Sequence, residues 1–155
     1  MKYSRLTKEQ FEELHKEFVN FLATQSITAE EWSKIKKSQP EVAEQELDVF
    51  SDLVWEGVLN KAMYLEHISA KQMHLFSLRE SDMHVVAVTI KSDINLTTKE
   101  GFQWLRENLM HDDVEFLQAT KRYSEDKNLD KFKLIQQGAV ITKGELYHFF
   151  DKLIN

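Results

Sequence analysis

Two Glu-x-x-His pairs, Glu12–His15 and Glu145–His148, are the first residues in this sequence that could carry chemistry. On facing helices of a bundle, such pairs build di-iron sites together with a further glutamate from each of two other helices. At 100° per residue, His148 lies roughly opposite the centre of the apolar face of its predicted helix, and Glu12 lies well off its own. Because ligands of a metal between helices must point inward, the sequence disfavours a di-iron site.

Three histidines, His67, His74 and His84, fall in a segment predicted to form a small sheet. If the first hairpin closes around residues 69–72, His67 and His74 stand opposite each other, with Glu66 on the other face. Two histidines on one sheet face could bind zinc or move a proton. A one-residue slip would separate them, and His84 joins them only in some registers. The alternative function is therefore a small metal-dependent enzyme on the sheet histidines, whereas ordinary strand histidines are the simpler interpretation.

A ladder of carboxylates follows strict i, i+4 spacing along residues 40–60. Like charges at this spacing repel each other by a few tenths of a kcal/mol per pair. On a helical wheel the ladder lies opposite the apolar face around Phe50, so we expect it to face solvent. Gly57 falls on the apolar face, where a mid-helix glycine suggests the close approach of another backbone.

Trp55 and Leu59 project toward the acidic side of this helix, where apolar side chains are not expected. The same chain could cover them, Trp55 could anchor a protein partner, or the carboxylates could hold Mg²⁺ or Ca²⁺. A single rigid helix is a poor cage for either ion. The candidate interaction face consists of Glu44, Asp48, Asp52, Trp55, Glu56 and Leu59.

The elements that must position these residues are delimited by capping signals. Thr7, Thr28, Thr97 and Thr142 each follow an aliphatic residue and precede a Glu or Gln by three positions, which is the capping-box pattern. The segments between turn signals predict helices at about 7–24, 28–39, 40–60, 98–110, 113–124, 129–137 and 143–154, and strands at about 63–68, 73–79 and 83–91. The predicted fold is α+β: a mainly helical single domain over residues 1–155, with a small three-stranded antiparallel meander between helical halves.

Composition removes several classes of function. The chain has 155 residues, a formal net charge of −6 and no cysteine. Without a clustered basic surface, nucleic acid binding is not expected. Thiolate catalysis and thiolate metal sites are excluded, and no apolar run reaches the ~20 residues of a membrane span. The opening MKYSRLTKEQF has no apolar signal-peptide region. We therefore expect a cytoplasmic protein without a cofactor.

Three segments carry a resemblance to a known group of proteins: MKYSRLTKEQFEEL, VFSDLVWEGVL and LIQQGAVITKGELY. Together they resemble a family of small uncharacterised proteins from Bacteroidetes-type bacteria, and the resemblance covers nearly the whole chain. It implies a bacterial domain and supplies no activity or site residue. With no catalytic constellation in view, the sequence favours a non-enzymatic module for protein–protein interaction or assembly, its partner being another protein or a second copy.

Overall fold

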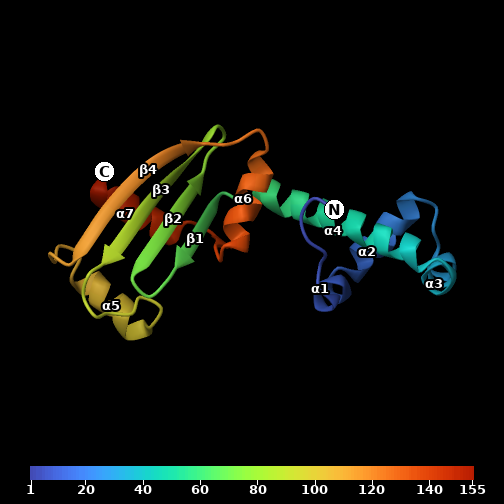
Figure 1. Ribbon diagram of the computed structural model, residues 1–155, viewed down its shortest axis with the longest axis horizontal. Coiled ribbons are helices and arrows are strands. Elements are labelled where there is room, and N and C mark those ends of the chain that lie inside the picture. The colour runs from blue at the N-terminus through green and yellow to red at the C-terminus, as the bar shows by residue number, and fades with distance from the viewer. The chain divides into compact units, whose positions relative to one another are not determined.

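The computed structural model describes residues 1–155, which divide into two compact units, residues 1–60 and 61–155 (Figure 1). The sequence predicts a single domain over residues 1–155. That the two units form one domain stays a prediction.

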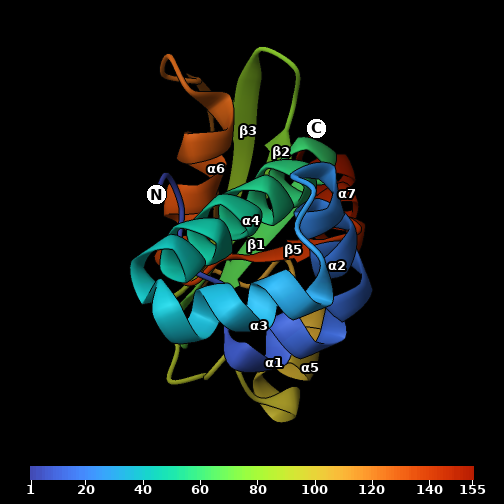
Figure 2. The ribbon, with the colours of Figure 1, turned by 90° about the vertical axis from the view of Figure 1, so that its right-hand side faces the viewer.

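The N-terminal unit is helical, and Figure 2 looks onto its helices. They are α1 (Lys8–Glu13), α2 (His15–Thr24), α3 (Ala29–Ser38) and α4 (Pro40–Lys61). Thr7 caps α1 in a complete capping box with Gln10, and the Thr28 side chain caps α3. The single helix predicted over 7–24 is interrupted at Leu14, whose φ of −100° and ψ of 22° are not helical.

Aromatic side chains build the core of this unit. Phe18 and Phe50 are buried together with Leu6 and Leu22. The Phe18 ring meets Phe50 edge-on at 5.1 Å and Trp32 edge-on at 5.2 Å between ring centroids. Edge-to-face pairs at this distance add to the free energy gained by burial. These contacts join α2, α3 and α4 around one core.

The C-terminal unit contains a five-stranded antiparallel sheet in the order β4-β3-β2-β1-β5. The strands are β1 (Tyr64–Ile68), β2 (Gln72–Leu78), β3 (Asp82–Ile90), β4 (Val114–Arg122) and β5 (Val140–Thr142). The helices are α5 (Lys99–Glu107), α6 (Lys127–Gln136) and α7 (Glu145–Ile154). No helix of the chain is both long enough and apolar enough to cross a lipid bilayer.

The predicted three-stranded meander is wrong, because the sheet has five strands. The segment 113–124 was predicted to be a helix, yet it holds β4. Its period-two apolar signal consists of Val114 and Phe116 alone, and the remaining residues of the strand are exposed. β5 is three residues long and therefore too short to show any periodicity.

Two helix starts also differ from the capping pattern. The N-cap of α5 is Thr98, one residue after the predicted Thr97, and its side chain accepts a hydrogen bond from the Gly101 amide. The N-cap of α7 is Gly144 in the left-handed conformation, whereas Thr142 ends β5. The ring of Tyr64 lies where a Cβ on Gly144 would be, so this position requires glycine twice over.

The two faces of the sheet are covered unequally. One face forms the main core, in which Met73, Leu75 and Val86 pack with Leu105 of α5 and Phe150 of α7. In Figure 1, α7 crosses behind the sheet. On the other face, α6 covers one end through Leu134 and Ile135, which pack near Leu65 and Leu78. We call the remainder of that second face the open sheet face.

Candidate functional site

The carboxylate ladder of α4 contacts residues that precede α1. The Arg5 guanidinium donates to Asp48 Oδ1 at 2.7 Å through Nε and to Glu44 Oε2 at 2.9 Å. The hydrogen bonds to Asp48 and then to Glu44 raise the pKa of Arg5, so the cation is fixed there. One arginine therefore offsets the repulsion between two neighbouring carboxylates of the helix.

The next two carboxylates of the ladder hold the first residues of the chain. Asp52 accepts backbone hydrogen bonds from Lys2 at 2.7 Å and from Tyr3 at 2.9 Å. The Tyr3 hydroxyl donates to Glu56 at 2.5 Å. Burial, and then the hydrogen bond to Glu56, raise the pKa of Tyr3 to about 12. All four carboxylates of the ladder thus have partners in the segment that precedes α1.

The apolar residues on this side of α4 are covered as well. Trp55 packs against the aromatic core of the N-terminal unit, and Leu59 is fully buried. The side that faces solvent instead contains Leu53, which is 57% exposed, and Gly57, whose surroundings are open. The predicted close approach at Gly57 is therefore wrong. That the acidic residues with Trp55 and Leu59 bind a partner stays a prediction.

The sheet places His67 directly opposite His74, which is the pairing that the sequence allowed in one register and left open. Glu66 lies on the other face, as does His84, whose cross-strand neighbour is Ser77. No group of three or more His, Cys, Asp or Glu side chains is arranged to hold a metal ion. A metal-dependent enzyme at these histidines stays a prediction that metal analysis of the untagged protein would test.

His67 has a close neighbour in the turn between α6 and β5. A Cβ built on Gly138, which has a φ of +118°, would lie 2.9 Å from His67 Nε2. The glycine therefore provides the space in which the imidazole rests. The imidazole of His67 therefore lies against the turn between α6 and β5.

His84 belongs to a hydrogen-bonded chain that attaches α7 to the sheet and is buried at His84 and Tyr147. His84 Nε2 lies 3.0 Å from the amide oxygen of Gln118, and Nδ1 lies 2.6 Å from the Tyr147 hydroxyl. With that oxygen as acceptor, Nε2 carries the proton and Nδ1 accepts from Tyr147. Gln118 also exchanges hydrogen bonds with Asn155, beyond the end of α7. Both ring nitrogens are satisfied, which is typical of a structural histidine.

The pair on the open sheet face predicts a measurable pH dependence. Burial, and then the charge of His67, lower the pKa of His74 below its usual value of about 6.5. Between the two values the unfolded chain binds more protons than the folded chain, so stability rises with pH. We expect His74→Gln to reduce the loss of melting temperature between about pH 8 and pH 5 relative to wild type.

Glu66 is present in both wild type and His74→Gln, so the difference between the two proteins reports the contribution of His74 to the pH dependence of stability. Burial raises the pKa of Glu66, so its contribution to stability is lost as pH rises through the folded-state value and has the opposite sign. His67→Gln is the matched variant, because it removes the neighbouring charge while keeping His74. An unchanged pH dependence in His74→Gln would contradict the assignment.

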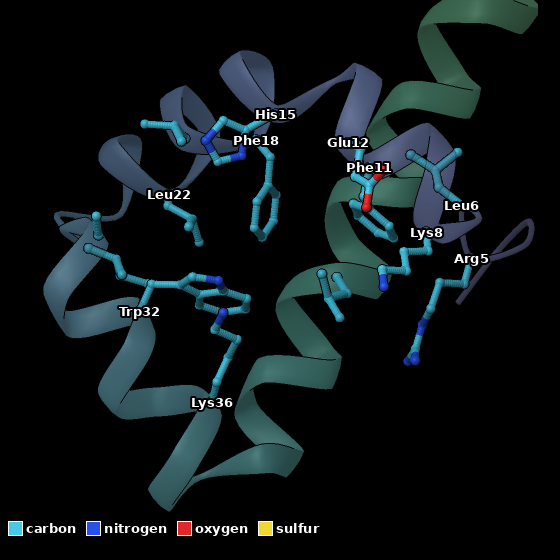
Figure 3. A pocket seen from close by; sticks show the side chains of 14 residues that line it. Arg5, Leu6, Lys8, Phe11, Glu12, His15, Phe18, Leu22, Trp32 and Lys36 are labelled. Atoms are coloured by element: carbon cyan, nitrogen blue, oxygen red, sulfur yellow. The ribbon is translucent and has the colours of Figure 1, made fainter.

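A pocket of about 580 Å³ lies within the N-terminal unit (Figure 3). Its apolar lining comes from α1, α2, α3, α4 and the turn before α3. The larger of these side chains include Phe11, Phe18, Leu22, Ile27, Trp32 and Leu47. The rings of Phe18 and Trp32 point into the pocket in Figure 3. The volume lies within the range of about 300–1,000 Å³ that is typical of ligand sites.

Charged groups surround this apolar lining. Lys36 lies over the Trp32 ring at 6.0 Å, and Lys8 extends from the other side of the pocket. Neither lysine forms an ion pair, whereas Arg5 is already held by two carboxylates. Glu12 and His15 complete the polar rim. Within a chain of net charge −6, the pocket thus carries two uncompensated lysines and one carboxylate.

The pocket is the feature that sequence reasoning missed. The helical spacing of Phe11 and Phe18 within residues 7–24 predicts that both side chains point inward. No periodicity distinguishes a filled core from one that stays open on one side. Lys8 and Lys36 are separated widely in sequence, so only the folded helices bring them to one rim. Val19 also lines the pocket and is 42% exposed, and only the folded structure shows this.

The fold and the site together define a class of protein: a small α+β protein with an apolar pocket flanked by lysines. The chain belongs to DUF6495, a family of unknown function, which matches residues 1–155. Comparisons with curated proteins and with solved structures find no match.

Proposed function

We propose that this chain is a non-enzymatic protein–protein interaction module whose N-terminal pocket binds an amphipathic, acidic helix of a partner protein. The observation that carries the proposal is the combination of an apolar lining with lysines that have no ion-pair partner. A solvent-facing hollow lined by Phe18 and Trp32 leaves apolar surface in contact with water, and a partner that fills it gains the free energy of burial.

The shape of the walls favours a helical occupant. Helices form most of the pocket, and in Figure 3 their ribbons surround the lining side chains. A hollow between helices is the usual receptor for an amphipathic helix, whose apolar side chains recur at i, i+3, i+4 and i+7. Phe18 and Trp32 then supply the large, rigid contact areas that dominate binding energy at interfaces.

The charges favour an acidic occupant. Lys8 and Lys36 lie on different sides of the pocket, so carboxylates flanking an apolar helix face can reach both. Glu12 adds one negative charge to the rim, and Arg5 is neutralised by the ladder. Complementary charges at a rim mainly increase association rate and selectivity, so binding should weaken as salt concentration rises.

Panning a display library of helical peptides against the full chain tests the proposal. We expect acidic amphipathic sequences to be enriched on wild type and lost on Val19→Asp, which places a charge in the apolar wall. Lys8→Glu/Lys36→Glu should reverse the charge preference of the selected peptides. Lys37→Glu is the matched control, because it makes the same change on α3 at a residue that does not line the pocket.

Two results would overturn the proposal. Enriched peptides that bind Val19→Asp as well as wild type would place the interaction elsewhere. Absence of peptide enrichment, together with binding of a long-chain fatty acid that Val19→Asp abolishes, would assign the pocket to a small amphipathic acid. The bacterial origin and the cytoplasmic location stay predictions from the sequence.

A further inference from the structure

β4 is an edge strand with one neighbour in the sheet, β3. It is nine residues long, it contains no proline, and seven of its nine side chains are exposed. The other edge, β5, has three residues. Figure 1 shows no element of the C-terminal unit along the outer side of β4. A long open edge of this kind presents a row of backbone donors and acceptors to another strand.

The hydrogen bonding of the sheet shows which backbone groups face this open edge. The Lys91 amide donates to the carbonyl of Asp113 at 2.9 Å, just beyond the paired residues Ile90 and Val114. In an antiparallel ladder, residues that bond to the neighbour alternate with residues that do not. Odd-numbered residues of β4 therefore bond to β3, and the N–H and C=O groups of Phe116, Gln118 and Thr120 point outward.

We infer that β4 pairs antiparallel with β4 of a second copy, about a two-fold axis at Gln118, to join two sheets into one. Gln118 is the middle residue of Val114–Arg122, so this register alone pairs the whole strand with its copy. It also places the outward-facing backbone groups of Gln118 opposite themselves and those of Phe116 opposite those of Thr120. These are the residues that can exchange hydrogen bonds across the new edge.

The side chains are complementary in the same register. Glu115 lies opposite Lys121 of the second copy, and by symmetry Lys121 lies opposite the second copy's Glu115. Lys121 has no ion pair within the chain, and Glu115 has a distant one, 3.8 Å from Lys91. Leu117, which is 56% exposed, lies opposite Ala119 of the second copy. Opposite charges and apolar pairs directly across strands stabilise a sheet.

Neighbouring registers lose this complementarity. Moving the axis to Leu117 places Glu115 opposite Ala119, and moving it to Ala119 places Lys121 opposite Leu117. Charged residues near an edge ordinarily discourage pairing. Here the order of Glu115 and Lys121 along the strand places each charge opposite its counter-charge when the second copy is aligned at Gln118. An unrelated strand would not supply both counter-charges. A second copy is therefore the occupant that the edge fits.

Sedimentation equilibrium of the full chain tests the inference. We expect a monomer–dimer equilibrium that Lys121→Glu weakens by about tenfold, because it places like charges opposite each other twice per dimer. Adding Glu115→Lys to Lys121→Glu exchanges both charges and should restore dimerisation. Rescue by the double variant is a result that general destabilisation of the fold does not produce.

Thr120→Pro is the second variant, and it acts on the backbone. The Thr120 amide faces the open edge, so proline removes a donor to the second copy and none to β3. We expect a monomer whose melting temperature stays near that of wild-type monomer. A wild-type chain that is monomeric at all concentrations would overturn the inference. So would a dimer that neither Thr120→Pro nor the charge reversal weakens.

Discussion

Replacing Gly101 by alanine is expected to lower the free energy of unfolding of the C-terminal unit by about 1–3 kcal/mol or more. A Cβ at this position would lie 1.8 Å from the backbone oxygen of Asn95 and 2.5 Å from its carbonyl carbon. Because both atoms are backbone, a change of rotamer cannot relieve the overlap. The Asn95 carbonyl is also held by the amide and the hydroxyl of Thr98, the N-cap of α5. Alanine must therefore displace the cap or the start of the helix.

Gly57→Ala is the matched control, because the same change is made in a helix where a Cβ meets nothing within 4 Å. Alanine restricts the unfolded chain and is expected to raise stability there by about 0.5–1 kcal/mol. The two substitutions lie in different compact units, and urea denaturation of each full-length variant measures its effect against wild type. Equal small effects of both substitutions would contradict the close approach at Gly101.

Phe150→Ala is expected to lower the free energy of unfolding of the C-terminal unit by about 3–5 kcal/mol. Phe150 is 1% exposed and packs in the main core with Met73 and Val86. Its ring lies 6.0 Å from that of Phe116, centroid to centroid. Alanine removes this apolar area and leaves a cavity that the surrounding strands cannot fill.

The neighbouring Phe149 supplies the control for this prediction. Its side chain is 49% exposed, so Phe149→Ala should cost much less than Phe150→Ala in urea denaturation. The same experiment checks the orientation of α7, which presents Tyr147 and Phe150 to the sheet. Comparable losses for Phe149 and Phe150 would show that α7 is rotated about its axis relative to the structure described above.

The parts of the fold that could be predicted are those with strong local signals. β1, β2 and β3 are rich in apolar and β-branched residues, are separated by short polar stretches, and lie within one residue of the predicted strands. β4 was missed because its inward side chains are few, and a segment with sparse apolar residues fits a helical pattern equally well. The pairing of β5 with β1 depends on a contact between distant residues, which no local pattern of three residues can indicate.

The carboxylate ladder shows how a correct pattern can lead to an incomplete interpretation. Its spacing and its position on α4 were predicted, as was the conflict with Trp55 and Leu59. The covering segment was not, because Arg5 carries no periodic signal that connects it with Asp48. The same limit applies to the pocket, where the open side of the core depends on the placement of α3 beside α2, and this follows from tertiary packing.

The strand order has a consequence for the synthesis of this protein. β1 to β4 pair with their neighbours in sequence, so the meander can form as the chain leaves the ribosome. β5 pairs with β1 only after β4 and α6 have been made. Until then β1 is a nascent-chain edge, and the main core lacks Tyr147 and Phe150. Residues 140–154 therefore complete both the sheet and its core. A ribosome that stalls before residue 140 leaves an aggregation-prone intermediate with an unpaired β1 edge and exposed apolar side chains.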